Sequence, residues 1–261
     1  MARILGIDWA VDPKDRAAVM LDVSTAGIEV VEVRATLSDE EAGSSCKGAA
    51  VVAVDVPFGW PREFVDFVKR WKPSDGQPMP PPSDGFRLRQ TDRRIREIKS
   101  PLSVSTDLIG LAARSWTEVV ARHQLGPAID VEGSLKSSGP TLIEVYPAAT
   151  LVALGFSIDK PSYKKDAGKR TTIVTDLAAR FSISLGPHLA AIVRERDRAD
   201  ETDALVAALT GVLYLRTIAK TAPRELEVIL PTASERELAR TEGWIFAPAP
   251  TKAEEPRGQE G

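Results

Sequence analysis

The sequence predicts an α/β fold in which an antiparallel meander is followed by a parallel strand. Three short apolar segments, residues 3–10, 17–23 and 27–33, are separated by breaks too short for a crossover helix, so neighbouring segments should pair antiparallel. A fourth segment, residues 49–56, is apolar at seven of its eight positions without alternation, which indicates a strand buried on both faces. Helical periodicity follows this strand, as in α/β chains.

Residues 37–48 are predicted to form the helix that connects the third strand to the fourth. With that crossover, the fourth strand runs parallel to the first, and we expect the two strands to be neighbours. The first strand contains Asp8 and the fourth contains Asp55 near its end, so this topology brings two carboxylates close together. Pro57 then stops the strand, and a helix is expected over residues 61–72.

The remaining elements are predicted from apolar periodicity and from the prolines and glycines at their ends. A fifth strand is expected near residues 141–146 and an edge strand at 244–246, with helices near 106–124, 147–155, 171–181, 187–197 and 200–214. Residues 73–85 read as a loop, because Pro-Ser-Asp-Gly occurs in it twice. We expect one domain over residues 1–250 and a flexible tail over 251–261.

Composition excludes several classes of protein and of site. An apolar content of 43% and a charged content of 27% are ordinary for a globular protein, and a net charge of −3 gives no global basic signal. With one cysteine and two histidines, neither a disulfide framework nor a Cys/His zinc site is expected. No segment reaches the ~20 apolar residues of a membrane span, and no signal peptide is recognised. We therefore expect a cytoplasmic protein with no membrane partner.

Several carboxylates lie inside or at the end of apolar elements, where hydrophobic residues are the ordinary expectation. The candidate catalytic acids are Asp8, Asp55, Glu144 and Asp203. Asp200 lies one helical turn before Asp203 and on nearly the same side. Concentrated carboxylate oxygens are the ligands that hard divalent cations bind. The set predicts a site for Mg²⁺, or for Mn²⁺, whose ligands are Asp8, Asp55, Asp203 and Asp200.

Each acid also has a structural alternative. Asp8 suits hydrogen bonds from a neighbouring turn, Asp55 suits the cap of the following helix, and Glu144 suits a bond from the tyrosine two residues on. Asp200 is a good helix N-cap, and Asp203 would lie near the third helical position, where the helix dipole favours an acid. The metal interpretation depends on the whole set, because independent caps have no reason to converge.

Two basic clusters are candidates for binding phosphate. Six basic residues occur between positions 87 and 99, and four more between positions 164 and 170. Such runs are usually solvated helix faces. Beside a metal site they become candidate phosphate contacts, and the predicted partner is then nucleic acid. The candidate substrate-binding residues are Arg89, Arg93, Arg96, Lys164 and Lys165.

Five motifs occur in a fixed order over residues 3 to about 215. They are Gly6-Ile-Asp8, Val54-Asp55-Val-Pro-Phe-Gly-Trp-Pro61, Arg89-Gln-Thr-Asp92-Arg, Glu144-Val-Tyr-Pro147 and Asp203-Ala-Leu-Val-Ala-Ala208. This order resembles the domain of unknown function 429 family, described as a predicted nuclease of the ribonuclease H-like superfamily. Some relatives carry a second acid after the proline of the fourth motif, where this chain has Ala148.

The resemblance implies a ribonuclease H-like mixed sheet, with three antiparallel strands, then two parallel ones, and helices on both faces. It also implies that Asp8, Asp55 and Asp203 are the metal ligands. The function expected is Mg²⁺-dependent, two-metal hydrolysis of nucleic-acid phosphodiester bonds. Asp8 would bridge the ions, Asp55 and Asp203 would each complete one, and Glu144 or Asp200 would hold a ligand or orient water.

Two other functions remain open on the sequence. An ATP-dependent phosphotransferase of the actin and sugar-kinase type has a related sheet, but small Gly and Thr residues follow its first acid so that phosphate can approach the backbone. In this chain, Trp9 follows Asp8 instead. The other function is a catalytically silent module that binds nucleic acid.

Overall fold

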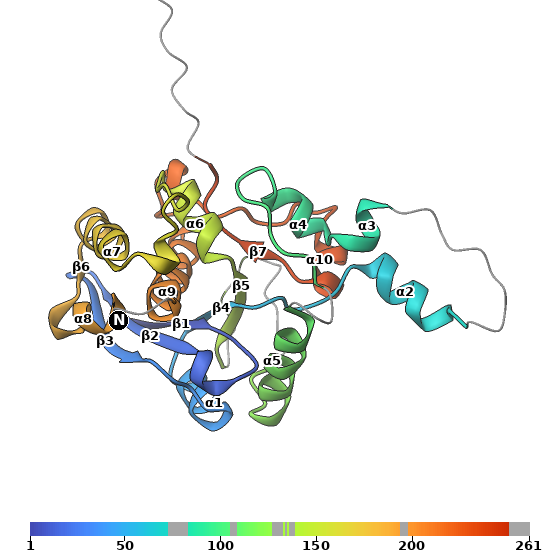
Figure 1. Cartoon of the computed structure of the whole chain (residues 1–261), viewed down its shortest axis with the longest axis horizontal. Helices are drawn as coiled ribbons and strands as arrows, with labels where there is room; N and C mark the ends of the chain where they lie inside the picture. Colours follow the sequence, from blue (N-terminus) through green and yellow to red (C-terminus); the bar gives the residue numbers. More distant parts are fainter. Residues whose placement is uncertain are drawn as a thin grey trace, which may run out of the picture.

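A mixed sheet forms the centre of the molecule (Figure 1). The computed structural model describes residues 1–72, 83–104, 109–126, 133, 135, 139–193 and 198–250. Within these residues the sheet has seven strands in the order β6–β3–β2–β1–β4–β5–β7. Their bounds are β1 (Ala2–Asp8), β2 (Ala17–Ser24), β3 (Gly27–Arg34), β4 (Val51–Asp55), β5 (Thr141–Val145), β6 (Ile183–Ser184) and β7 (Ile245–Phe246).

The strand directions confirm the predicted meander and the predicted parallel crossover. β1, β2 and β3 pair antiparallel, whereas β4 pairs parallel with β1 and β5 pairs parallel with β4. β7 is the expected edge strand and pairs parallel with β5. The two-residue β6, which pairs parallel with β3, was not predicted, because so short a strand has no sequence pattern.

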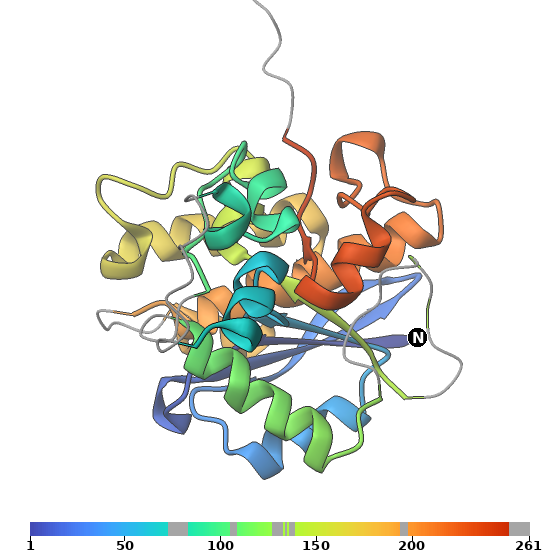
Figure 2. The same ribbon diagram turned by 90° about the vertical axis from the view of Figure 1, so that its right-hand side faces the viewer.

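Helices cover both faces of the sheet, as Figures 1 and 2 show. α6, α7 and α9 pack on one face, and α1 and α5 pack on the other. The bounds are α1 (Asp39–Lys47), α2 (Arg62–Arg70), α3 (Asp84–Arg87), α4 (Gln90–Ile95), α5 (Leu111–Arg122), α6 (Pro147–Ala153), α7 (Ala167–Phe181), α8 (Leu189–Ile192), α9 (Asp200–Ile218) and α10 (Arg236–Glu242). No helix in the described segments is long and apolar enough to cross a membrane.

Most predicted helices occur at the expected places, with shifted ends. α8 is much shorter than the helix expected over residues 187–197, and α3, α4 and α10 were not predicted. Positions 73–82, 105–108, 194–197 and 251–261 lie outside the described residues. The predicted tail, most of the predicted loop and the first turn of the helix expected near 106–124 lie in these ranges.

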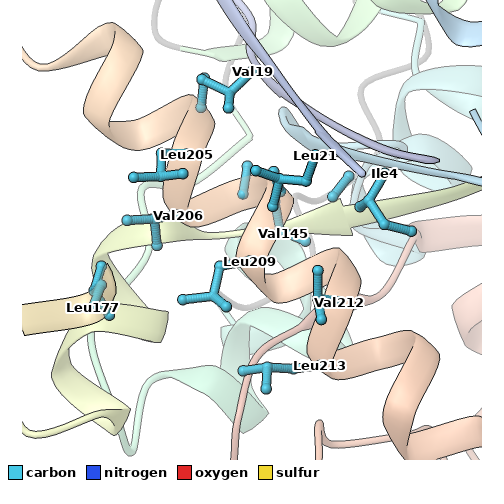
Figure 3. Packing of buried hydrophobic residues seen from close by; sticks show 14 of the residues in the cluster. Ile4, Val19, Leu21, Val145, Leu177, Leu205, Val206, Leu209, Val212 and Leu213 are labelled. Carbon is cyan, nitrogen blue, oxygen red and sulfur yellow. The ribbon is translucent and has the colours of Figure 1, made fainter. Parts of the chain in front are cut away.

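α9 is the central helix of the larger core (Figure 3). Every residue from Asp200 to Tyr214 is buried, which fits a helix that is apolar on nearly all sides. Leu205, Leu209 and Val212 belong to the same core cluster as side chains of β1, β2 and β5. The helix therefore carries Asp203, one turn from its start, into the interior.

Gly6 allows α9 to approach β1 at backbone distance. A Cβ atom at this position would lie 2.1 Å from the carbonyl oxygen of Ala204 and 2.3 Å from the backbone nitrogen of Ala208. Asp8 lies two positions after Gly6 and therefore on the same face of the sheet. Because Asp203 precedes Ala204, this close contact brings the helix acid toward the strand acid.

Candidate active site

Asp8 and Asp55 lie side by side at one edge of the sheet. In the parallel pairing of β1 with β4, Asp8 is the register partner of Asp55, and each is the last residue of its strand. Both carboxylates project from the face that α9 covers, since Asp8 and Asp55 lie two positions after Gly6 and Ala53, which are on that face. The structure thus confirms the topology that the sequence predicts for this pair.

The turn after β4 does not use Asp55 as a helix cap. The backbone N–H of Phe58 donates to Glu144 Oε2 at 3.0 Å, and that of Arg62, the first residue of α2, donates to Glu242 Oε1 at 2.7 Å. Within the described residues, neither Asp8 nor Asp55 accepts a side-chain hydrogen bond or forms an ion pair. Their oxygens are therefore available to a ligand.

Asp203 reaches the same edge of the sheet from α9. Its Oδ1 accepts a hydrogen bond from the Tyr163 hydroxyl at 2.6 Å, and its Oδ2 lies 2.8 Å from Lys164 Nζ. Both partners belong to a short 3₁₀ helix, Tyr163–Lys165. The N-cap of α9 is Ala199, so Asp200 is not at the N-cap position predicted for it, whereas Asp203 lies in the first turn, where the helix dipole favours an acid.

The three carboxylates, which we call the acidic triad (Asp8, Asp55 and Asp203), influence one another electrostatically. Burial raises the pKa of Asp8 well above its usual value, and the charges of Asp203 and Asp55 raise it further. Burial, followed by the charge of Asp203, raises the pKa of Asp55 to about 7. Lys164 opposes both shifts. Like charges held together in this way favour a bound cation.

Asp200 contributes to the triad only at its margin. Its Oδ2 lies 3.2 Å from Arg198 Nη2, and its charge is the smallest of the influences that raise the pKa of Asp8. The structure does not bring it to the register position shared by Asp8 and Asp55. Its predicted role as a metal ligand stays a prediction.

Glu144 lies on the opposite face of the sheet from Asp55. Its register partner in β4 is Val54, and neighbouring positions of a strand point to opposite faces. The carboxylate accepts hydrogen bonds from Arg89 Nη1 at 2.9 Å and Nη2 at 2.7 Å, together with the Phe58 bond. Burial raises the pKa of Glu144, and Arg89 opposes that shift. Glu144 thus fixes the turn after Asp55, and it also lines the pocket that Asp8 and Asp55 line, so its predicted catalytic role stays a prediction.

Arg89 is an interior residue with 1% of its surface exposed. Besides its two bonds to Glu144, its Nε and Nη2 donate to Asp92 at 3.1 and 2.9 Å, and its Nη1 donates to the Glu242 carbonyl oxygen at 3.1 Å. All five N–H groups are therefore used inside the protein. No N–H remains for a phosphate, in contrast to the contact predicted from the basic run.

The other predicted phosphate contacts are distributed over the surface. Arg93 donates to the Leu88 carbonyl and to Gln90 Oε1, and Arg96 forms an exposed ion pair with Asp84 at 3.6 Å. Lys165 is exposed. Lys164, by contrast, is in direct contact with the triad, although 53% of its side chain remains exposed. Of the five predicted contacts, Lys164 forms an ion pair with the triad, and Arg89 lines the same pocket as Asp8 and Asp55.

A pocket of about 220 Å³ opens over the strand acids. Asp8 and Asp55 line it together with Tyr146, which follows β5, and apolar side chains such as Leu102. Tyr146 donates to the carbonyl oxygen of Ser100 at 3.4 Å and not to Glu144. Burial, followed by the charge of Asp55, raises the pKa of the Tyr146 hydroxyl. Arg89 and Glu144 also line this pocket, so its lining combines three carboxylates and a guanidinium group with apolar side chains.

The donor set suits a hard divalent ion without forming a complete cage. Within the described segments, no three acidic, histidine or cysteine side chains are arranged as a ready-made metal site. Asp8 and Asp55 nevertheless offer oxygen ligands beside a pocket, and no donor among the described residues forms a hydrogen bond to either side chain. Each oxygen of Asp203 already has a protein partner, Tyr163 or Lys164, so an ion at Asp203 would compete with these two contacts. The strand pair is thus the part of the triad best suited to hold an ion.

Sequence reasoning missed Tyr163 and Glu242. In the sequence, Tyr163 precedes two lysines, and this aromatic residue beside basic ones was the available signal. Its burial is known only from the structure. Glu242 accepts the first backbone N–H of both α2 and α4, at 2.7 Å each. Nothing in the local sequence marks this role, since both helices lie about 150 to 180 residues earlier in the chain.

The metal-free protein is expected to lose stability as the pH rises from about 4 to about 7. A carboxyl group whose pKa is higher in the folded state binds more protons there, so its stabilising contribution is complete below the unfolded pKa of about 3.9 and is lost above the folded value. Thermal unfolding in EDTA should show this trend, and Asp55→Asn should weaken it. Parallel pH profiles for the two proteins would contradict the raised pKa.

Comparison with known proteins identifies the family of the chain. A family model described as a protein of unknown function (DUF429) matches residues 6–227. No curated protein and no solved structure matches the chain. The matched range contains the acidic triad and Lys164, whereas β7 and Glu242 lie after it. Because the match covers most of its length, the chain belongs to the DUF429 family.

Proposed function

We propose that this protein is a divalent-metal-dependent nuclease that hydrolyses phosphodiester bonds of nucleic acid. The observation that carries the proposal is the pair Asp8 and Asp55. The two carboxylates lie at adjacent strand ends beside a pocket, and no described residue donates a hydrogen bond to either side chain. Groups that repel one another and lack protein partners are stabilised by binding a cation.

The fold supports the same function by analogy. Three antiparallel strands followed by two parallel ones, with acids at the ends of β1 and β4 and near the start of α9, match part of the arrangement that the ribonuclease H-like resemblance implies, and β6 and β7 add further strands at the two edges. Fold analogy alone does not establish an activity. We therefore base the proposal on the acids and use the fold as its context.

In the proposed mechanism, Asp8 and Asp55 hold Mg²⁺ or Mn²⁺. When bound, such an ion supplies a Lewis acid and an activated water for phosphodiester hydrolysis. Lys164 presents a partly exposed ammonium group at the acids, where it attracts the phosphate of the substrate. Arg89 and Glu144 are positioning residues, because their bond network includes the Phe58 N–H and so fixes the turn after Asp55.

The residues after Asp8 argue against a phosphotransferase of the actin and sugar-kinase type. The buried Trp9 donates through Nε1 to Ser115 Oγ at 2.9 Å, and the Arg16 guanidinium lies 3.6 Å from the centre of the Trp9 ring. Arg16 is buried and bonds the carbonyl oxygens of Ala10 and Val11. Bulky side chains thus fill the segment in which a phosphate-binding loop needs an accessible backbone.

A nuclease panel tests the proposed function directly. Single-stranded, duplex and branched DNA and RNA would be incubated with the full chain in Mg²⁺, Mn²⁺ or EDTA. We expect cleavage of at least one substrate with Mg²⁺ or Mn²⁺, its loss in EDTA, and its recovery when the ion is added back. Binding without cleavage under every condition would instead identify a silent binding module, and cleavage that EDTA does not affect would exclude a metal mechanism.

A further inference from the structure

Both carboxylate oxygens of Asp203 are already bound within the protein. The Tyr163 hydroxyl donates to Oδ1 at 2.6 Å, and Lys164 Nζ lies 2.8 Å from Oδ2. We call these two side chains the Tyr163–Lys164 clamp. Asp203 is 1% exposed, so solvent does not replace these partners. Of the triad, Asp203 is therefore the acid whose charge the protein itself neutralises.

The backbone of the clamp is held in place by a buried arginine, Arg170. Arg170, which is 1% exposed, donates through Nη1 to the backbone carbonyl oxygens of Tyr163 and Lys164, both at 3.0 Å. Asp166 follows the clamp and caps α7 by accepting the backbone N–H of Lys169 at 2.9 Å. The backbone that carries Lys164 is thus anchored to a helix, unlike that of a lysine on a free loop.

The net charge of the triad and Lys164 favours the binding of one divalent ion over the binding of two. When all three carboxylates are ionised, they and the Lys164 ammonium group together carry a formal charge of minus two, which one Mg²⁺ balances. A second ion beside Asp203 would lie next to the Lys164 ammonium group and would be repelled by it. Moving Lys164 away would leave Asp203 as a buried charge without its cation, which is costly.

From this arrangement we propose that Asp8 and Asp55 bind a single divalent ion, and that the Lys164 ammonium group takes the place of a second ion at Asp203. This inference rests on the proposed function and replaces its two-metal form with one ion and one lysine. Tyr163 then has a positioning role, since it holds the carboxylate oxygen that Lys164 does not use.

Counting the bound ions tests the inference without measuring activity. Isothermal titration calorimetry with Mg²⁺, and titration with Mn²⁺ followed by electron paramagnetic resonance, would be carried out on the wild type, Lys164→Met and Lys165→Met. We expect one ion in the wild type and in the exposed neighbour Lys165→Met. Lys164→Met should bind a second ion, because its Asp203 oxygen is released. Two ions in the wild type, or one ion bound equally by Lys164→Met, would overturn the inference.

Asp203→Asn supplies a second, independent variant. If Lys164 replaces the second ion, Asp203→Asn should still bind one ion with an affinity within about tenfold of the wild type. A fall from two ions to one would show that Asp203 is an ordinary ligand and would overturn the inference. If the wild type cleaves nucleic acid and binds two ions, the nuclease proposal stands and the Lys164 assignment is wrong. If it binds one ion but cleaves no substrate, the nuclease proposal is wrong and the Lys164 assignment stands. A wild type that binds no ion refutes both.

Discussion

Replacing Asp55 with asparagine is expected to remove metal-dependent cleavage and to raise the melting temperature of the metal-free protein. Cleavage should fall at least about 100-fold, because even outer partners of metal ligands are worth about 10–100-fold. The melting temperature should rise because the substitution removes a carboxylate that burial and Asp203 disfavour. A gain on the order of 1 kcal/mol corresponds to roughly 2–4 °C in a chain of this size.

The same two effects are expected for Asp8→Asn, whose carboxyl has the same neighbours. Asp176→Asn is the matched control, because this exposed residue of α7 should change neither quantity. Cleavage would be measured with Mg²⁺, and thermal unfolding would be measured in EDTA at neutral pH. A variant that loses stability would show that the carboxylate supports the fold, and retained cleavage would place the chemistry elsewhere.

Replacing Arg89 with methionine is expected to destabilise the protein by about 3–5 kcal/mol, the usual cost of removing one partner of a buried ion pair. Arg89 neutralises Glu144 and Asp92, and both of these acids are buried. Without it, the carboxylates must either remain as unpaired charges or take up protons. Urea denaturation of the full chain at neutral pH would measure the loss.

Arg93→Met is the control for Arg89→Met, because Arg93 lies in α4, the helix whose N-cap is Arg89, but is only half-buried. Its loss should cost less than about 1 kcal/mol. The double variant Arg89→Met, Glu144→Leu should recover part of the stability, since it removes one of the two orphaned acids. If Arg89→Met is as stable as the wild type, the two acids are already protonated and the network is not ionic.

The strand topology could be predicted because local features determine it. Short breaks after the first two strands leave no room for crossovers, and the long apolar run before Asp55 marks a strand covered on both faces. Together with one connecting helix, these features place Asp8 and Asp55 on neighbouring parallel strands, as the structure has them. The two strand acids of the candidate site therefore followed from the sequence.

The places of Glu144 and Arg89 could not be predicted, because they depend on register and on distant segments. A shift of one residue in the β4–β5 pairing would turn Glu144 toward the face of Asp55, and no sequence pattern distinguishes the two registers. Arg89 looked like one member of a solvated basic run. Besides the nearby Asp92, its partners come from β5 and from the end of α10, far away in the chain.

Gly6 sets the distance between β1 and α9, and with it the spacing of the acidic triad, without the help of any polar group. The gap between β1 and α9 is as narrow as two backbones permit, since Gly6 faces Ala204 and Ala208 without a side chain. One added methyl group would push the helix outward and carry Asp203 away from Asp8, although every charged residue would be unchanged. The apolar packing of α9 against β1 thus holds Asp203 close to Asp8, although their charges repel each other. Electrostatic strain at the acids is balanced by the hydrophobic core itself.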